Sequence, residues 1–193
     1  MYKLFFLIWF VFLLTISAKS QDLDSTKVSS LEQEFTDSIS QINKQNQHLK
    51  ASRDAYNEGL IFFKNENYSE AIPCFTKAIG VDSIFLEAYL SRAKCYEELD
   101  DSLAITDYLK TFELDSTNVL PLYGVADLYL KSDKALAEEM YMTILSLKSD
   151  EYKAMSQLGI IAFINEKYDD AEKLFTQSLL INTNAYTLND RGS

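Results

Sequence analysis

The chain has 193 residues, and its 5 Gly and 2 Pro are too few for a sandwich or barrel of many short strands. A hydrophobic content of 47% and a charged content of 24% fit a folded domain rather than a disordered chain. The net charge of -11 disfavours non-specific binding of nucleic acid, because phosphate contacts need a basic surface. With one His and 2 Cys, few routes remain to a zinc site or a His-dependent catalytic triad.

The first twenty residues have the form of a signal peptide. Lys3 precedes an apolar run at residues 4–16, and a small and polar stretch follows, in which Ala18 and Ser20 suit a cleavage site. The run is shorter than the ~20 residues that a membrane-spanning helix needs. We therefore predict a signal peptide at residues 1–20 and an exported chain, secreted or periplasmic. The alternative is a membrane anchor formed by residues 4–16.

Residues 21–51 are predicted to form a leader followed by an amphipathic helix. Apolar residues recur at helical spacing with polar residues between them, and they are Val28, Leu31, Phe35, Ile39, Ile42 and Leu49. The favoured interpretation is a helix that caps the following domain. A short coiled coil is the alternative, since most of these positions fit a heptad, although Ser38 and Gln45 interrupt the seam.

Residues 52–185 contain an internal repeat. Ala71, Ala104, Ala137 and Ala171 are spaced by 33, 33 and 34 residues, and a period of this length is typical of stacked supersecondary units. Within each unit the apolar residues follow two successive helical patterns. The sequence therefore predicts four helical hairpins, at residues 52–85, 86–118, 119–151 and 152–185. Residues 186–193 are expected to be part of a fifth repeat or a truncated end, because Gly192 follows Gly159 by 33 residues.

The repeat resembles the tetratricopeptide repeat family. The first unit carries the family's order of small and aromatic residues, as Gly59, Phe62, Tyr68, Ala71, Phe75 and Ala78. The resemblance implies an all-α fold, a right-handed superhelical solenoid of about four repeats, here with an additional N-terminal helix. One departure is systematic: the family usually has Pro between units, and this chain has Ser83, Ser116, Ser149 and Thr183. Their hydroxyls are predicted to cap the next helix.

The resemblance also implies a function in protein binding. The family binds partners on the concave face, which is lined by the first helix of each unit. The residues expected to line this groove are Arg53, Tyr56, Leu60, Phe63, Lys64, Leu90, Lys94, Tyr123, Asp127, Lys131, Lys153, Ile160 and Phe163. Apolar anchors among isolated positive charges suit a peptide, although the same pattern also fits an ordinary solvated face.

The sequence predicts no catalysis. It has no Gly-rich phosphate loop ending in Gly-Lys-Ser/Thr, no Gly-x-Ser-x-Gly and no His-Glu-x-x-His, so we expect no catalytic residue, no metal and no cofactor. The expected partner is a protein or peptide, not nucleic acid, with membrane contact only if the N-terminal segment is retained. An alternative function is a sensory or docking part of a longer membrane signalling protein or enzyme that is truncated at its C-terminus.

Two further features bear on this function. The positions that hold a terminal carboxylate in the chaperone-tail binders of the family are here Tyr56, Leu60, Ser91, Leu120 and Gly124, and none matches the Lys, Asn and Arg used there. Cys74 and Cys95 lie on elements expected to be neighbours. A disulfide between them is one alternative, and two free thiols are the favoured one.

Overall fold

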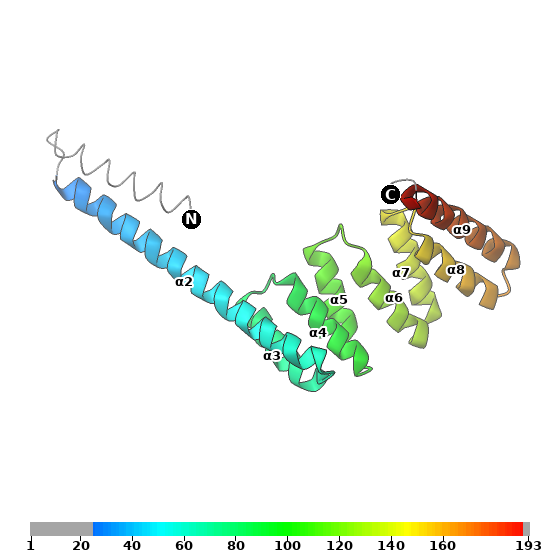
Figure 1. Cartoon of the computed structure of the whole chain (residues 1–193), viewed down its shortest axis with the longest axis horizontal. Helices are drawn as coiled ribbons and strands as arrows, with labels where there is room; N and C mark the ends of the chain where they lie inside the picture. Colours follow the sequence, from blue (N-terminus) through cyan, green and yellow to red (C-terminus); the bar gives the residue numbers. More distant parts are fainter. Residues whose placement is uncertain (1–24, 191–193) are drawn as a thin grey trace. The chain divides into compact units, whose positions relative to one another are not determined.

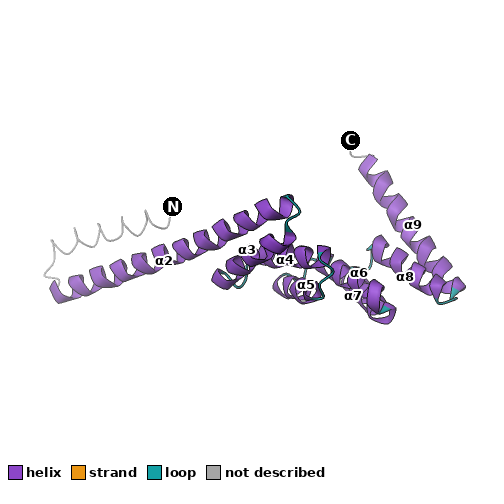
Figure 2. Cartoon of the chain, turned by 90° about the horizontal axis from the view of Figure 1, so that it is seen from below, coloured by secondary structure: helices purple, strands orange, loops and turns teal. Residues whose placement is uncertain are grey.

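The computed structural model describes residues 25–190, which form eight helices and no strand (Figures 1 and 2). The chain divides into two compact units, residues 1–51 and 52–193, which are described separately. The predicted signal peptide, with its apolar run, lies outside the described residues. The helices are α2 (Ser25–Lys64), α3 (Tyr68–Val81), α4 (Leu86–Glu98), α5 (Leu103–Leu114), α6 (Leu120–Ser132), α7 (Lys134–Leu147), α8 (Tyr152–Ile164) and α9 (Tyr168–Asp190).

The first unit consists, in its described part, of the N-terminal portion of α2. The predicted amphipathic helix over residues 28–49 is present, and it runs into the first repeat as part of one unbroken helix. Three residues of its apolar stripe are at least 40% exposed, namely Leu31, Ile42 and Leu49. Among the described residues, none of the four hydrophobic core clusters includes a side chain of this segment.

The second unit is a stack of antiparallel helical hairpins (Figure 1). Each second helix carries one of the repeated alanines, and all four are buried: Ala71, Ala104 and Ala137 at 0% exposure and Ala171 at 2%. A small residue at each crossing lets the two helices approach closely. The all-α repeat fold predicted from the sequence is confirmed.

The residue pair at the centre of each hairpin differs between the outer and the inner repeats. A Cβ added to Gly59 would lie 2.6 Å from the ring of Phe75, and one added to Gly159 would lie 2.7 Å from Phe175. The two inner repeats have Ala93 and Ala126 at this place, and their second helices carry Tyr in place of Phe. The small residue and the aromatic residue therefore change together between the outer and the inner repeats.

The tyrosines of the inner repeats also form hydrogen bonds that Phe cannot form. Tyr108 OH donates to Glu97, and its ring packs on Gly124 of the next hairpin, where an added Cβ would lie 2.6 Å from the ring. Tyr141 OH donates to Asp127 Oδ1 at 2.6 Å. Each hydroxyl is thereby satisfied by a carboxylate of the first helix in its own repeat.

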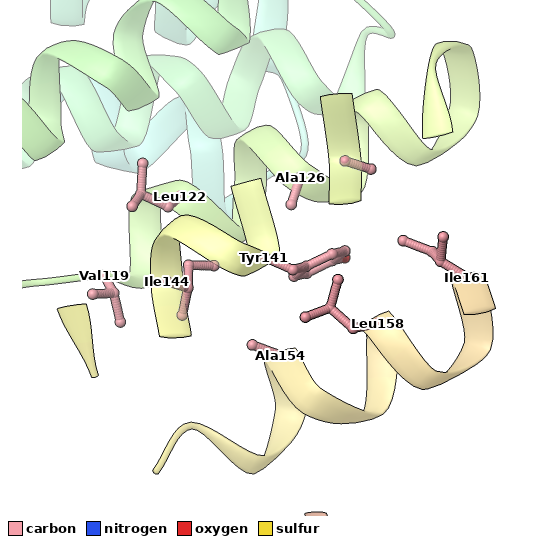
Figure 3. Packing of buried hydrophobic residues seen from close by; sticks show 9 residues of the cluster. Val119, Leu122, Ala126, Tyr141, Ile144, Ala154, Leu158 and Ile161 are labelled. Atoms are coloured by element: carbon pink, nitrogen blue, oxygen red, sulfur yellow. The ribbon is translucent and has the colours of Figure 1, made fainter. Parts of the chain in front are cut away.

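The largest core cluster joins α6, α7 and α8 (Figure 3). The ring of Tyr141 is fully buried and lies between Ala126 and Leu158, with Ile161 beyond it. Ile144, which stands where the other repeats have Ala78, Thr111 and Ser178, is also fully buried in this cluster. The third repeat therefore accommodates the larger side chain in its core.

The prediction that hydroxyls cap the helices is wrong. The N-terminal residues before α4, α6 and α8 are Phe85, Val119 and Glu151, and none caps its helix with a side chain. The side-chain acceptors near these starts are an Asp and an Asn: Asp82 Oδ1 accepts from Ile84 N in the loop before α4, and Asn118 Oδ1 accepts from Leu120 N, the first residue of α6. Asp and Asn satisfy free N–H groups two residues onward in this way.

Thr183 does not start a helix either. It lies inside α9, where its hydroxyl donates to the Leu179 carbonyl at 2.6 Å. Helix α9 continues without a break to Asp190, past the position where the sequence predicts the end of the fourth repeat. A hydroxyl that is bonded to the preceding turn of its own helix is no longer available to cap.

Candidate functional site

The predicted groove residues fall into an exposed set and a packed set. The packed members are half-buried side chains, namely Tyr56, Leu60, Phe63, Leu90 and Tyr123. The exposed members are the charged residues Arg53, Lys64, Lys94, Asp127, Lys131 and Lys153, together with Ile160 at 44% and Phe163 at 58% exposure.

A cavity between α6 and α8 brings three of the predicted residues together. It has a volume of about 230 Å³ and is lined by Tyr123 and Asp127 of α6 and by Tyr152, Lys153, Ser156 and Gln157 of α8. Because α6 and α8 are the first helices of adjacent repeats, equivalent positions of the two repeats face each other across this cavity. We call it the α6–α8 cavity.

Internal hydrogen bonds fix several of the polar groups around this cavity. Tyr123 OH donates to Glu151 Oε2 at 3.1 Å, and burial together with the nearby Glu151 carboxylate raises the pKa of Tyr123. Asp127 accepts the Tyr141 hydroxyl. Ser156 shares a hydrogen bond of 2.6 Å with Ser178, in which either hydroxyl can be the donor. These groups are held in place before any ligand arrives, which reduces the entropic cost of binding.

The groups left for a ligand are a cation, an amide and a carboxylate oxygen. Lys153 is exposed, and within the described residues it forms no ion pair. Gln157 contributes an amide, which both donates and accepts, and Asp127 retains its second oxygen for a further bond. Beside the two tyrosine rings, this set can bind the polar main chain of a peptide while the rings pack on one of its side chains.

Other predicted groove residues serve the core. The ring of Tyr56 lies 5.5 Å from Phe75 and 4.9 Å from Phe85, and its hydroxyl is 3.3 Å from Ser91 Oγ. Phe63 forms an edge-on pair with Tyr68 at 5.5 Å. Truncating either ring would remove packing from the first repeat, so both are poor probes of binding.

The sequence analysis missed a larger cavity among α7, α8 and α9. It has a volume of about 440 Å³, and none of the predicted residues lines it. Its apolar part comes from Met142, Leu158, Ala162 and Leu174, and its polar part from Glu138, Asn165, Lys167, Asp170, Lys173 and Gln177. We call it the α7–α9 cavity.

The equivalent space in the second repeat is filled by an ion pair. Arg92 of α4 donates from Nε to Asp107 Oδ2 at 2.6 Å and from Nη2 to Oδ1 at 2.8 Å, and its third nitrogen donates to Thr76 Oγ1 at 3.0 Å. By the repeat spacing, Arg92 and Asp107 of the second repeat correspond to Leu158 and Leu174 of the fourth, and Thr76 of the first repeat corresponds to Met142 of the third. Aligning the repeats position by position would have revealed this difference in the sequence.

The remaining chemistry of the described residues is sparse. No group of three or more His, Cys, Asp or Glu in this part of the chain is placed to hold a metal ion. Within residues 25–190, no helix is long and apolar enough to cross a membrane. Cys74 and Cys95 are both free thiols, and burial raises the pKa of Cys95 to about 11, with a further contribution from Glu98. A thiol of this pKa is a poor nucleophile at neutral pH.

The geometry defines a class of protein, the helical-hairpin repeat proteins, in which each hairpin buries its apolar face against its neighbours. Residues 55–84 match the family model described as tetratricopeptide repeat. The chain is 26% identical over 124 residues to DnaJ homolog subfamily C member 3 of Gallus gallus, an alignment that covers 63% of this chain and 25% of that relative.

Solved structures share the fold. The crystal structure of MamA superposes with a TM-score of 0.64 at 19% identity, covering 86% of this chain and 98% of MamA. The first tetratricopeptide domain of Spaghetti (RPAP3), bound to the HSP90 peptide SRMEEVD, superposes with a TM-score of 0.53 at 22% identity, covering 61% of this chain and 94% of that domain. Residues 55–84 are thus similar to a tetratricopeptide repeat, and the described helices have the fold of these solved structures.

Proposed function

We propose that this chain is a non-catalytic scaffold that binds a peptide segment of a partner protein at the α6–α8 cavity. The observation that carries the proposal is the convergence there of Tyr123, Asp127 and Lys153 on a preformed space of about 230 Å³. The cavity combines aromatic surface with donors and acceptors, as peptide sites commonly do.

The fold relatives support a peptide as the ligand. RPAP3 binds an HSP90 peptide on the same fold. The peptide proposed here differs in chemistry, because the positions that hold a terminal carboxylate in chaperone-tail binders carry Tyr56, Leu60, Ser91, Leu120 and Gly124 in this chain. We therefore propose an internal segment, bound through its main chain and one apolar side chain, rather than an acidic C-terminus.

A peptide library displayed on phage tests this function without knowledge of the natural partner. Peptides selected on the wild-type chain are measured against the double variant Lys153→Glu/Gln157→Ala, which changes one exposed and one half-exposed residue of the cavity. We expect at least a tenfold loss of affinity, since a bound segment would lose a cation and an amide at once. Circular dichroism checks that the repeats stay folded.

The matched control is Lys173→Glu, which makes the same charge change at the rim of the α7–α9 cavity. Affinity should be unchanged in this variant. Peptides that resist the Lys153→Glu/Gln157→Ala change and are lost with Lys173→Glu would place the site at the α7–α9 cavity and contradict the proposal. A library that yields no specific peptide would contradict peptide binding altogether.

For location, we propose an extracytoplasmic compartment. The support is the apolar run at residues 4–16 with the small residues that follow it. The mass of the chain purified from its native source distinguishes a cleaved signal, which removes residues 1–20, from a retained anchor. A full-length mass in a soluble fraction would contradict both.

A further inference from the structure

The N-terminal portion of α2 carries an apolar stripe that the described residues leave without a partner. Leu31, Ile42 and Leu49 are 42%, 42% and 40% exposed, and each occupies the same face of the helix. Tertiary packing of an apolar face supplies most of the stability of a helix in water. A single helix with this stripe therefore gains stability when a second surface covers it.

We propose that a second copy of this chain covers the stripe, and that residues 28–49 of the two copies form a parallel two-stranded coiled coil. The heptad core positions are Val28, Leu31, Phe35, Ser38, Ile42, Gln45 and Leu49. Five of these seven are apolar, and the β-branched Val28 and Ile42 fall at the a position, where such residues favour two strands.

The two polar core positions specify an in-register partner. Ser38 already donates its hydroxyl to the Glu34 carbonyl at 2.8 Å within its own helix, so it can enter a core without an unsatisfied group. Gln45 needs a partner that both donates and accepts, and the amide of a second Gln45 provides this. An antiparallel pairing that sets Phe35 against Ser38 would place Gln45 against Val28 and leave the amide unpaired.

The flanking residues agree with the parallel arrangement. In this register the g position of one helix meets the following e position of the other. Lys27 then meets Glu32 of the second copy, and both side chains are exposed in the single chain. At the next pair, the aliphatic part of the Glu34 side chain meets Ile39 of the second copy. At the pair after that, the amide of Gln41 meets the amide of Asn46 of the second copy. The parallel pairing brings no like charges together at these positions.

Cysteine cross-linking in the full chain tests the face and the register. In a Cys74→Ser background, which leaves only the buried Cys95, Ser38→Cys places a thiol in the seam and Ser40→Cys places one on the opposite face. On mild oxidation we expect most of the Ser38→Cys chain to become a covalent dimer, and at least tenfold less of the Ser40→Cys chain. Leu31→Cys and Leu49→Cys should each also link to their own equivalents.

Light scattering with size-exclusion chromatography provides the second readout. The wild-type chain in mild detergent should have twice the mass of 22.1 kDa, and Ile42→Glu should have the single mass. Asn43→Glu, a change at the neighbouring position outside the seam, should remain dimeric.

Three outcomes would overturn the proposal. A monomeric wild-type chain would mean that no second copy covers the stripe. Equal linking of Ser38→Cys and Ser40→Cys in a dimer would place the interface elsewhere. Linking of Ser38→Cys without self-linking of Leu31→Cys and Leu49→Cys would exclude the parallel register.

Discussion

The second and fourth repeats form the same kind of hairpin, but different side chains occupy the space beside it. In the second repeat Arg92 reaches both Thr76 and Asp107 and fills the space with a paired charge. In the fourth repeat Leu158 and Leu174 occupy the equivalent positions, and a cavity of about 440 Å³ remains. A repeat can therefore keep its packing at the small and aromatic positions while the adjoining positions form either an ion pair or an open cavity.

Breaking the ion pair should give the largest effect. Asp107 is 4% exposed, and Arg92 also lies close to the rings of Tyr89 and Tyr96. Replacing Asp107 by Leu leaves the half-buried guanidinium without its carboxylate partner and with only the Thr76 hydroxyl, so we expect the free energy of unfolding in urea to fall by about 3 kcal/mol. The control is Asp100→Asn, at an exposed pair with Lys131, where the change should stay within about 0.5 kcal/mol. Equal effects of the two variants would contradict a special role for the buried pair.

Filling the small positions should have the next largest effect. Gly59→Ala forces a methyl against Phe75, which is fully buried, and overpacking of this kind costs about 1–3 kcal/mol. Gly159→Ala makes the same contact with Phe175, which is half-buried and has more room to move. Thermal unfolding should therefore show a larger loss for Gly59→Ala, and the reverse order would contradict the packing argument. Gly80→Ala, where an added Cβ meets nothing within 4 Å, is the control.

Transplanting the ion pair into the fourth repeat sharpens the comparison. The triple variant Leu158→Arg/Leu174→Asp/Met142→Thr places Arg and Asp in the fourth repeat and Thr in the preceding third repeat, as Arg92, Asp107 and Thr76 are placed in the second and first repeats. We expect its free energy of unfolding to lie within about 1 kcal/mol of the wild type, because replacing apolar residues by a fully paired ion pair changes stability little. Leu158→Arg alone should be clearly less stable, since its charge has no partner. An equally unstable triple variant would mean that the helices of the fourth repeat do not allow the same pairing.

The smallest effect concerns the thiols. Cys95 is fully buried in the second repeat, where the fourth repeat has Ile161, and its pKa is raised from 9.0 to about 11. Iodoacetamide at pH 8 should label Cys74 at least tenfold faster than Cys95 in the folded chain. The folded state favours the neutral thiol, so stability is retained below pH 9 and falls as the pH rises from about 9 towards 11. Cys95→Ala should remove this part of the fall, and an unchanged pH profile would contradict it.

Much of the fold could be predicted from one position per repeat. A close crossing of two helices needs a small residue whatever surrounds it. The spacing of the repeated alanines therefore predicts where the helices cross, at Ala71, Ala104, Ala137 and Ala171. The groove was harder to predict. Lys153 and Tyr56 were both predicted as groove residues from their place in the first helix of a repeat. Lys153 is exposed at the α6–α8 cavity, whereas Tyr56 packs against Phe75 and Phe85.

The helix ends and the cavities depended on details beyond the periodicity. Ser83 and Thr183 fall at the repeat boundary, yet Asp82 satisfies the free amide before α4 and Thr183 lies within a continuing helix. Which of several nearby polar side chains reaches an amide is decided by the local backbone course, which residue type alone does not specify.

The sequence by itself determined the helical hairpins and their order, because amphipathic periodicity and small residues at crossings are local properties. Only the tertiary structure decided which first-helix residues are free to bind and which are buried by a neighbouring repeat. It also decided that Arg92 closes one space while Leu158 leaves another open. The physical reason is that burial and pairing depend on side chains of three consecutive helices at once, which lie 15 or more residues apart in the sequence.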